Sequence, residues 1–351
     1  MRAISRTLAT RLVAATGALA LAAVSAGCAS STQKTADAAD AGSGGSGAVN
    51  LSNVTLTLGD QVSALKTLLN SSGALKGAKY HVKFAEFQGA APLFQAVKAG
   101  DVDTGYAADL PTLTAIAGGV PVKAVAALQA SGAGTAILVQ QGSTVQSLAD
   151  LKGKTVVVSS AKGSVAEELL ANALAKAGLK YSDVHVEYLL PAAALAAFNS
   201  HKIDVWATFG VYQDTAQAAG ARLLVDGRNG LTSGVGLISA TSAVLNDASK
   251  KAALTDVLRR INTALVWSTT HAAQYATAYA NAYNLSPAIA KTVVSQGSTA
   301  LLPLSTAEQA KIQQVSDVMH TIGSLPTDVS VADNSFAAVY TAADESSSAK
   351  S

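Results

Sequence analysis

Strand and helix patterns alternate along most of this chain, and this alternation restricts the possible folds more than any other feature of the sequence. From Val54 onward, short apolar runs are separated by longer segments in which apolar residues recur at helical spacing. Such an order produces βαβ units, in which the strands are mostly parallel and the helices cover the faces of the sheet. The sequence therefore predicts an α/β fold.

The pattern runs through two successive series and then becomes helical, which predicts two lobes and a helical C-terminal segment. The first series has predicted strands at 54–58, 81–87, 104–107, 122–128 and 135–139 and helices at 62–70, from about 92, and at 110–117. The second has predicted strands at 154–159, 185–189, 204–208 and 222–225 and helices at 164–177, 192–199 and 211–218. After a further strand near 234–240, residues 242–323 are helical in pattern and need an apolar partner, which we expect to be the first lobe.

The N-terminus has the pattern of an export signal. Three arginines precede a run at 12–27 that carries no charge and is too short to span a membrane, which takes about 20 apolar residues. The run ends at Cys28, the only cysteine, in a small-residue context that resembles the lipobox of bacterial lipoproteins. We therefore predict a signal peptide at 1–27 and a lipidated Cys28 opening a flexible tether at 28–53, with an ordinary cleaved signal as the alternative.

Composition and motifs exclude several classes of function. Beyond residue 27 the chain has 22 basic and 23 acidic residues, so it lacks the positive charge of a nucleic-acid-binding protein. One cysteine excludes an intrachain disulfide and multi-cysteine metal sites, and the five histidines show no metal-binding spacing. The G-x-S-x-G and phosphate-loop patterns are absent from the sequence of the body. We therefore expect no cofactor, no metal and no enzymatic activity.

Candidate ligand-binding residues are those that follow the predicted strands, because ligands of such sheets bind at the carboxyl ends of the strands. Several have a structural alternative: Ser164 with Glu167 forms a capping box, Asp109 fits a helix N-cap, and Phe209 fits the core. The candidates are Gln61, Ser63, Gln88, Gly89, Asp109, Ser131, Gly163, Ser164, Phe209 and Tyr212, of which Gln61, Gln88, Ser164 and Tyr212 in particular are expected to line the cleft.

Five local motifs resemble one family of transport receptors. They are Gly59-Asp60-Gln61, Glu86-Phe87-Gln88-Gly89, the pair 100–103 and 108–111, the entry to the second series at 148–156, and the strand at 202–207. Together they resemble the solute-binding proteins of ABC importers, specifically the aliphatic sulfonate, taurine and nitrate group, over roughly 54–340.

This resemblance implies a periplasmic-binding-protein-like fold of type II, with two α/β lobes joined by two hinge strands. By analogy, lobe one comprises 54–138 plus 232–343, lobe two comprises 139–231, and 344–351 is a disordered tail. The implied protein is a monomer held on the outer face of the cell membrane through Cys28. It closes on a small solute and delivers it to a permease and its ATPase.

The same comparison leaves the solute open. Sulfonate binders tend to read G-S-S-x-H where this chain has 163–167 ending in Glu167, and W-D-P-Y where it has 209–212. Backbone amides of 88–91 and 163–164 would still hold a tetrahedral oxyanion, which favours a sulfonate. A nitrate-like anion and a heterocyclic vitamin precursor are alternative solutes. A sensory or enzymatic surface protein on the same fold is the alternative function.

Overall fold

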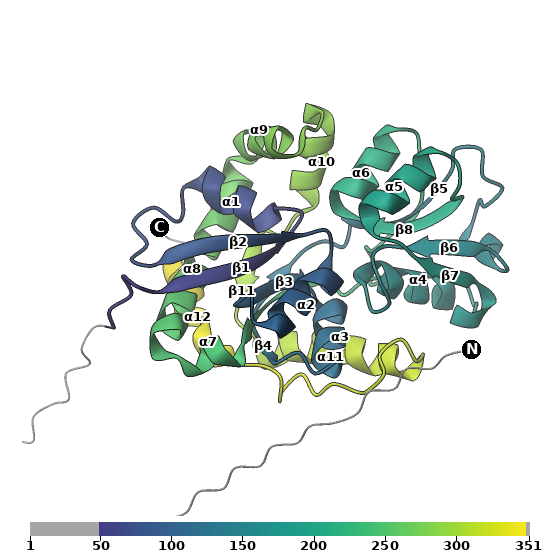
Figure 1. Ribbon diagram of the computed structural model, residues 1–351. Helices are drawn as coiled ribbons and strands as arrows, with labels where there is room; N and C mark the ends of the chain where they lie inside the picture. Colours follow the sequence, from purple (N-terminus) through teal and green to yellow (C-terminus); the bar gives the residue numbers. More distant parts are fainter. Residues whose placement is uncertain (1–48, 349–351) are drawn as a thin grey trace, which may run out of the picture. The chain divides into compact units, whose positions relative to one another are not determined.

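The computed structural model describes residues 49–348, which form two β-sheets flanked by helices (Figure 1). The two sheets are the centres of two lobes, and this confirms the predicted two-lobed α/β fold. The predicted signal peptide, Cys28 and almost all of the tether lie outside the described residues. Among residues 49–348, none of the helices combines the length and the apolar composition that a transmembrane segment needs.

Lobe one is built on a six-stranded sheet. In spatial order its strands are β11 (Ala300–Leu302), β4 (Val122–Gln129), β10 (Val235–Thr241), β3 (Thr104–Ala108), β1 (Thr55–Gln61) and β2 (His81–Phe87). Strands β1, β2 and β3 are parallel, whereas β10 runs antiparallel to both of its neighbours. Its helices are α1 (Ala64–Ser72), α2 (Ala90–Ala99), α3 (Asp109–Ala117), α7 (Ser242–Asn246), α8 (Ala248–Thr270), α9 (Ala272–Tyr283), α10 (Pro287–Gln296), α11 (Thr306–Thr321), the 3-10 helix η3 (Ala337–Val339) and α12 (Ala342–Ser348).

Lobe two is built on a five-stranded sheet. In spatial order its strands are β7 (His185–Tyr188), β6 (Thr155–Val158), β8 (Val205–Phe209), β5 (Thr135–Val139) and β9 (Arg222–Asp226). Its helices are the 3-10 helices η1 (Leu148–Leu151) and η2 (Tyr181–Asp183), α4 (Val165–Lys176), α5 (Pro191–Asn199) and α6 (Gly210–Ala218). Helix α4 covers one face of this sheet, and α5 and α6 cover the other (Figure 1).

Alternation along the strands divides lobe two into two hydrophobic cores, one on each face of its sheet. On β8, Val205 and Ala207 pack with α4, whereas Trp206 faces the opposite core and lies 5.5 Å from the ring of Phe198 on α5. The indole of Trp206 is fully buried and donates its N–H to Ser159 Oγ at 3.0 Å. Successive strand residues point to opposite faces of the sheet. The side chains of β8 therefore pack against α4 on one face and against α5 and α6 on the other.

The chain crosses between the lobes twice, at 130–134 and at 227–234, and the two segments lie against each other. Ala130 N donates to Gly234 O at 2.8 Å. Gly132 and Gly234 have φ of +80° and +67°, and a Cβ atom on either would lie 2.5 Å from a backbone oxygen of the other segment. Glycine is required at both positions because a side chain meets both a strained backbone and a close neighbour.

The first crossing comes earlier in the chain than the sequence predicted. The resemblance implies that lobe one extends to residue 138, but all of β5 pairs with β8, and most of it also with β9, in the sheet of lobe two. The apolar run of β5 predicts a strand without specifying its sheet, because strand pairing is set by contacts distant in sequence. The crossing therefore precedes Thr135.

The helical C-terminal segment packs on lobe one through contacts of α11 with α3 and of α12 with α8. The prediction that 344–351 is a disordered tail is wrong for the residues up to Ser348. Asp344 is buried, and its carboxylate accepts hydrogen bonds from Arg259 Nε at 2.7 Å and from Thr341 N at 2.8 Å. The polar composition of this segment predicts disorder, but its residues form helix α12, which polar contacts stabilise.

We predict that Gly132→Ala destabilises the protein by more than about 2 kcal/mol, because the new Cβ adds a backbone clash to the strain of a positive φ. Gly77→Ala is the matched control, since Gly77 has φ of +77° with nothing within 4 Å of the added Cβ. It should cost only about 1 kcal/mol. Urea unfolding measures the free energy of unfolding of both variants. Equal losses would contradict the conclusion that the close contact between the two crossings requires glycine at position 132.

Candidate functional site

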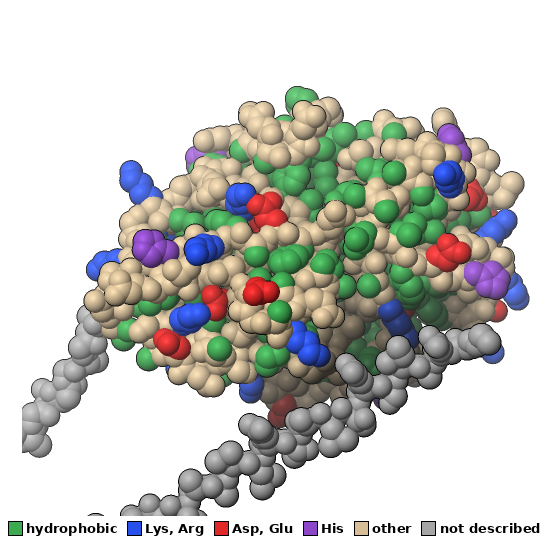
Figure 2. All heavy atoms as spheres, viewed as in Figure 1, with side chains coloured by type: hydrophobic (Ala, Val, Ile, Leu, Met, Phe, Trp, Pro, Cys, Tyr) green, Lys and Arg blue, Asp and Glu red, His purple; other side chains and the backbone are tan. Residues whose placement is uncertain are grey.

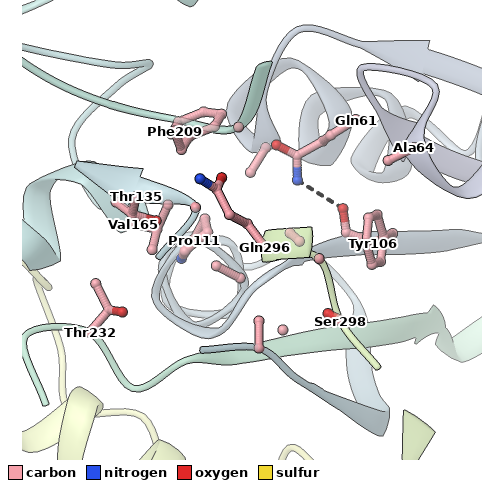
Figure 3. Close-up of a pocket in the computed structure, with 18 of the residues that line it drawn as sticks. Gln61, Ala64, Tyr106, Pro111, Thr135, Val165, Phe209, Thr232, Gln296 and Ser298 are labelled. Carbon is pink, nitrogen blue, oxygen red and sulfur yellow. Dashed lines mark hydrogen bonds between the residues drawn. The ribbon is translucent and has the colours of Figure 1, made fainter. Parts of the chain in front are cut away.

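A cavity of about 280 Å³ lies between the lobes, and we call it the interlobe cavity (Figure 3). Residues at the carboxyl ends of β1, β3 and β8 line it, together with residues of the two crossings and the end of α10. None of its lining residues carries a charged side chain. Its polar side chains are Gln61, Tyr106, Thr135, Ser160, Ser164, Thr232, Ser233, Tyr279, Gln296 and Ser298.

Three of the ten candidate residues line the interlobe cavity: Gln61, Ser164 and Phe209. The Gln61 amide donates to Tyr106 O at 2.8 Å, which fixes its side chain at the edge of the cavity (Figure 3). Ser164 Oγ also accepts the N–H of Glu167 at 3.3 Å, so the capping interpretation of Ser164 is correct as well.

Four of the other candidates lie at the surface, in a hydrophobic core or at a helix start. Gln88 is exposed beside the start of α2, and Tyr212 packs with the core under α5 and α6, so the expectation that both line the cleft is wrong. Ser131 is exposed on the first crossing, where its Oγ accepts Ala133 N. Ser63 precedes α1 in a left-handed conformation and does not line the interlobe cavity.

Gly89 and Gly163 lie where the two lobes approach each other closely, and neither lines the interlobe cavity. A Cβ on Gly89 would lie 2.8 Å from Ser160 Oγ, which belongs to lobe two. A Cβ on Gly163 would overlap the side chain of Thr114, which belongs to lobe one and donates weakly to Gly163 O at 3.4 Å. The contact between the lobes therefore leaves no room for a side chain at either position.

Several lining residues had no signal in the sequence. Gln296 and Ser298 flank the end of α10, which the sequence marked only as part of a helical segment, yet Gln296 reaches into the middle of the interlobe cavity (Figure 3). Its amide donates to Asp214 Oδ1 on α6 at 3.2 Å and so links the two lobes. Thr232 and Ser233 belong to the second crossing, which strand-end reasoning does not reach.

Helix N-termini from both lobes converge on the interlobe cavity. The first turns of α2, α3, α4 and α6 all contribute lining residues, and the backbone of a helix start carries partial positive charge. Helix α2 in lobe one and α6 in lobe two have neither a side-chain cap nor an acidic residue in the first turn. An uncharged cavity with two such ends favours an anionic group.

The N-terminus of α4 is less available to a ligand than the sequence suggested. The amide of Gly163, an expected oxyanion donor, donates to the Glu167 carboxylate instead. The same carboxylate accepts the hydroxyls of Tyr181 and Tyr188 at 2.8 and 2.9 Å. Glu167 therefore satisfies its own helix start.

Two buried carboxyl groups, one from each lobe, interact near the second crossing. Asp109 on α3 and Glu168 on α4 are 0% and 1% exposed. Asp109 Oδ1 accepts Leu110 N at 2.7 Å and Glu168 Oε1 accepts Ser233 N at 2.9 Å, while their other oxygens have no partner. Burial raises the pKa of both carboxyls, and the charge of Asp109 raises that of Glu168 further. Asp109 lies outside the interlobe cavity and is not the N-cap, which is Ala108.

We predict that Glu168→Gln stabilises the protein increasingly as the pH rises from about 5 to about 8. A carboxyl with a raised pKa contributes stability below its unfolded pKa and loses it as the pH rises through the folded pKa, whereas Gln stays neutral. The gain at about pH 8 should be about 1–3 kcal/mol by urea unfolding. Glu187→Gln, an exposed acid on β7, is the control. A pH-independent effect of Glu168→Gln would contradict the buried pair.

Comparisons with known proteins agree with the motifs in the sequence. A family model described as "NMT1/THI5 like" matches residues 77–253. A curated protein of Escherichia coli strain K12, "Putative aliphatic sulfonates-binding protein", is 33% identical over 184 residues, which cover 51% of this chain and 57% of that protein. The alignment thus spans little more than half the length of that relative.

Two solved structures share the fold over most of their length. The alkanesulfonate-binding protein SsuA of Xanthomonas axonopodis pv. citri, bound to MOPS, has a TM-score of 0.75 at 28% identity, covering 82% of this chain and 98% of that one. The periplasmic aliphatic sulphonate binding protein SsuA of Escherichia coli has a TM-score of 0.70 at 27% identity, covering 80% and 92%. The predicted family resemblance and the periplasmic-binding-protein-like fold are thereby confirmed.

Proposed function

Because the chain belongs to the NMT1/THI5-like family, we propose that it is the extracytoplasmic solute-binding receptor of an ABC importer. The observation that carries this proposal is the uncharged interlobe cavity, which takes its lining from both lobes. A solute that contacts both lobes stabilises their closed arrangement, and this gives a receptor two states that a permease can distinguish. In this role the protein is a monomer that binds its solute reversibly, without turnover, and delivers it to the permease and its ATPase.

The solute is proposed to be an alkanesulfonate, held by its anionic head. A sulfonate presents three acceptor oxygens, and the interlobe cavity supplies hydroxyl groups from Ser160 of lobe two and from Ser233 of the crossing. The uncapped starts of α2 and α6 supply positive potential from opposite lobes. The names of the relatives, and the MOPS bound to one of them, support the same class of solute.

We predict that alkanesulfonates stabilise the purified body against heat, whereas nitrate and pyrimidines do not. A ligand at 100 times its Kd adds about 2.7 kcal/mol to the free energy of unfolding, which a thermal melt detects readily. Mass spectrometry of the recovered ligand should show it unchanged. Stabilisation by nitrate or a pyrimidine alone would show that this compound, and not a sulfonate, is the solute. Chemical conversion of the ligand would contradict the receptor role.

We predict that Ala90→Asp weakens sulfonate binding at least about tenfold relative to Ala90→Asn. Ala90 opens α2, is buried, and lines the interlobe cavity, so a carboxylate there repels an anion while remaining compatible with a helix start. Asn has nearly the same shape without the charge, which separates electrostatic from steric effects. Calorimetry gives both dissociation constants. Equal values would show that the anionic head of the solute does not bind near Ala90.

Attachment to the membrane through Cys28 is part of the proposed function. Cys28→Ser should abolish incorporation of labelled palmitate and move the protein from the membrane fraction to the soluble fraction. Ser30→Ala, a neighbouring change outside the lipobox-like segment, should leave both properties intact. Membrane retention of the Cys28→Ser protein would show that another feature anchors it.

A further inference from the structure

A second, smaller cavity adjoins the interlobe cavity inside lobe one, and we call it the inner cavity. It has a volume of about 100 Å³. Five residues line both cavities, namely Ala64, Tyr106, Tyr279, Gly297 and Ser298. Figure 3 shows Ala64, Tyr106 and Ser298 on one side of the interlobe cavity, across from Phe209 and Thr135 of lobe two. The inner cavity therefore adjoins the interlobe cavity on the side away from lobe two.

The wall of the inner cavity is largely aliphatic and aromatic, with hydroxyl groups from Tyr106, Tyr275, Tyr279, Ser268 and Ser298. Leu65 and Leu68 of α1 and Ile261 and Leu265 of α8 face it, and all four belong to the main hydrophobic core of lobe one. No residue that lines it carries a charge. The hydroxyl of Ser268 is already used, since it donates to Leu265 O at 2.7 Å. The aliphatic side chains of the wall offer a water molecule no hydrogen-bond partner, so the part of the inner cavity that they line is suited to an apolar group.

The size of the inner cavity favours a narrow group over a ring. An apolar protein cavity of roughly 150 Å³ holds a benzene molecule, and this one is smaller. Tyr106 and Tyr279 belong to both walls, so a group that enters from the interlobe cavity passes beside their side chains. An unbranched alkyl chain satisfies both the volume and the entrance.

We propose that the inner cavity is the tail site of the receptor: the solute's head lies between the lobes and an unbranched alkyl tail extends past Tyr106 and Tyr279 into lobe one. This inference rests on the proposed function for the head and adds the chemical class of the tail. Burial of each methylene in an apolar site is favourable, so the tail site selects solutes by chain length.

The test is calorimetry with ethane-, butane- and hexanesulfonate. The dissociation constant should fall about fourfold for each added methylene until the inner cavity is filled. Val293→Phe, on α10, and Leu68→Phe, on α1, fill the inner cavity from two different helices and should each abolish this gain. Val318→Phe is the matched control, because Val318 is exposed on α11 and should leave the whole series unchanged.

The outcomes separate the tail site from the head. Binding of ethanesulfonate with no gain along the series would overturn the tail site and keep the proposed function. If no sulfonate binds, thermal melts with butanol and hexanol apply the same test without the head. Stabilisation that rises with alcohol length in the wild type and disappears in Val293→Phe would support the tail site. It would also show that the solute is not a sulfonate. No dependence on length in either series would overturn the tail site.

Discussion

The arrangement of the whole body depends on the contact between the two segments that cross between the lobes. Gly132 and Gly234 let their backbones approach closely, and the bond from Ala130 N to Gly234 O joins them. After crossing, β5 and β10 each enter the sheet of the other lobe antiparallel to both neighbours. As a result, residues at the strand ends and helix starts of both lobes border one cavity, which a single solute can contact from two sides.

The electrostatics of the interlobe cavity come from the backbone, since no charged side chain lines it. Acids lie close by on α3, α4 and α6, and on α6 Asp214 accepts the amide of Gln296 while burial raises the pKa of its carboxyl to about 6. Glu167 accepts an amide and two tyrosine hydroxyls. Burial raises the pKa of Asp109 and Glu168, which favours their neutral forms. The starts of α2 and α6, which have no side-chain cap and no acid in the first turn, supply positive potential at the interlobe cavity. The charges on the visible face are scattered without a patch of one sign (Figure 2).

The sequence was sufficient for the elements and the fold but only partly for the site. Period and composition located nearly every strand, and the motifs identified the family. The sheet to which β5 belongs was misassigned because pairing is non-local. Among the site residues, strand-end reasoning succeeded for Gln61 and Phe209, which directly end their strands. It failed for Tyr212, whose side chain turns to the core, and could not reach Gln296, which only the folding back of α10 brings into the interlobe cavity.

The central claim is that an uncharged cavity between two lobes recognises an anion through helix starts and hydroxyls. Calorimetric titration with ethanesulfonate and with ethyl methyl sulfone tests it most directly, because the two solutes are nearly equal in shape and differ in charge. The account predicts measurable binding of the sulfonate and at least about tenfold weaker binding of the sulfone. Equal affinity for the two, or preference for the sulfone, would contradict it.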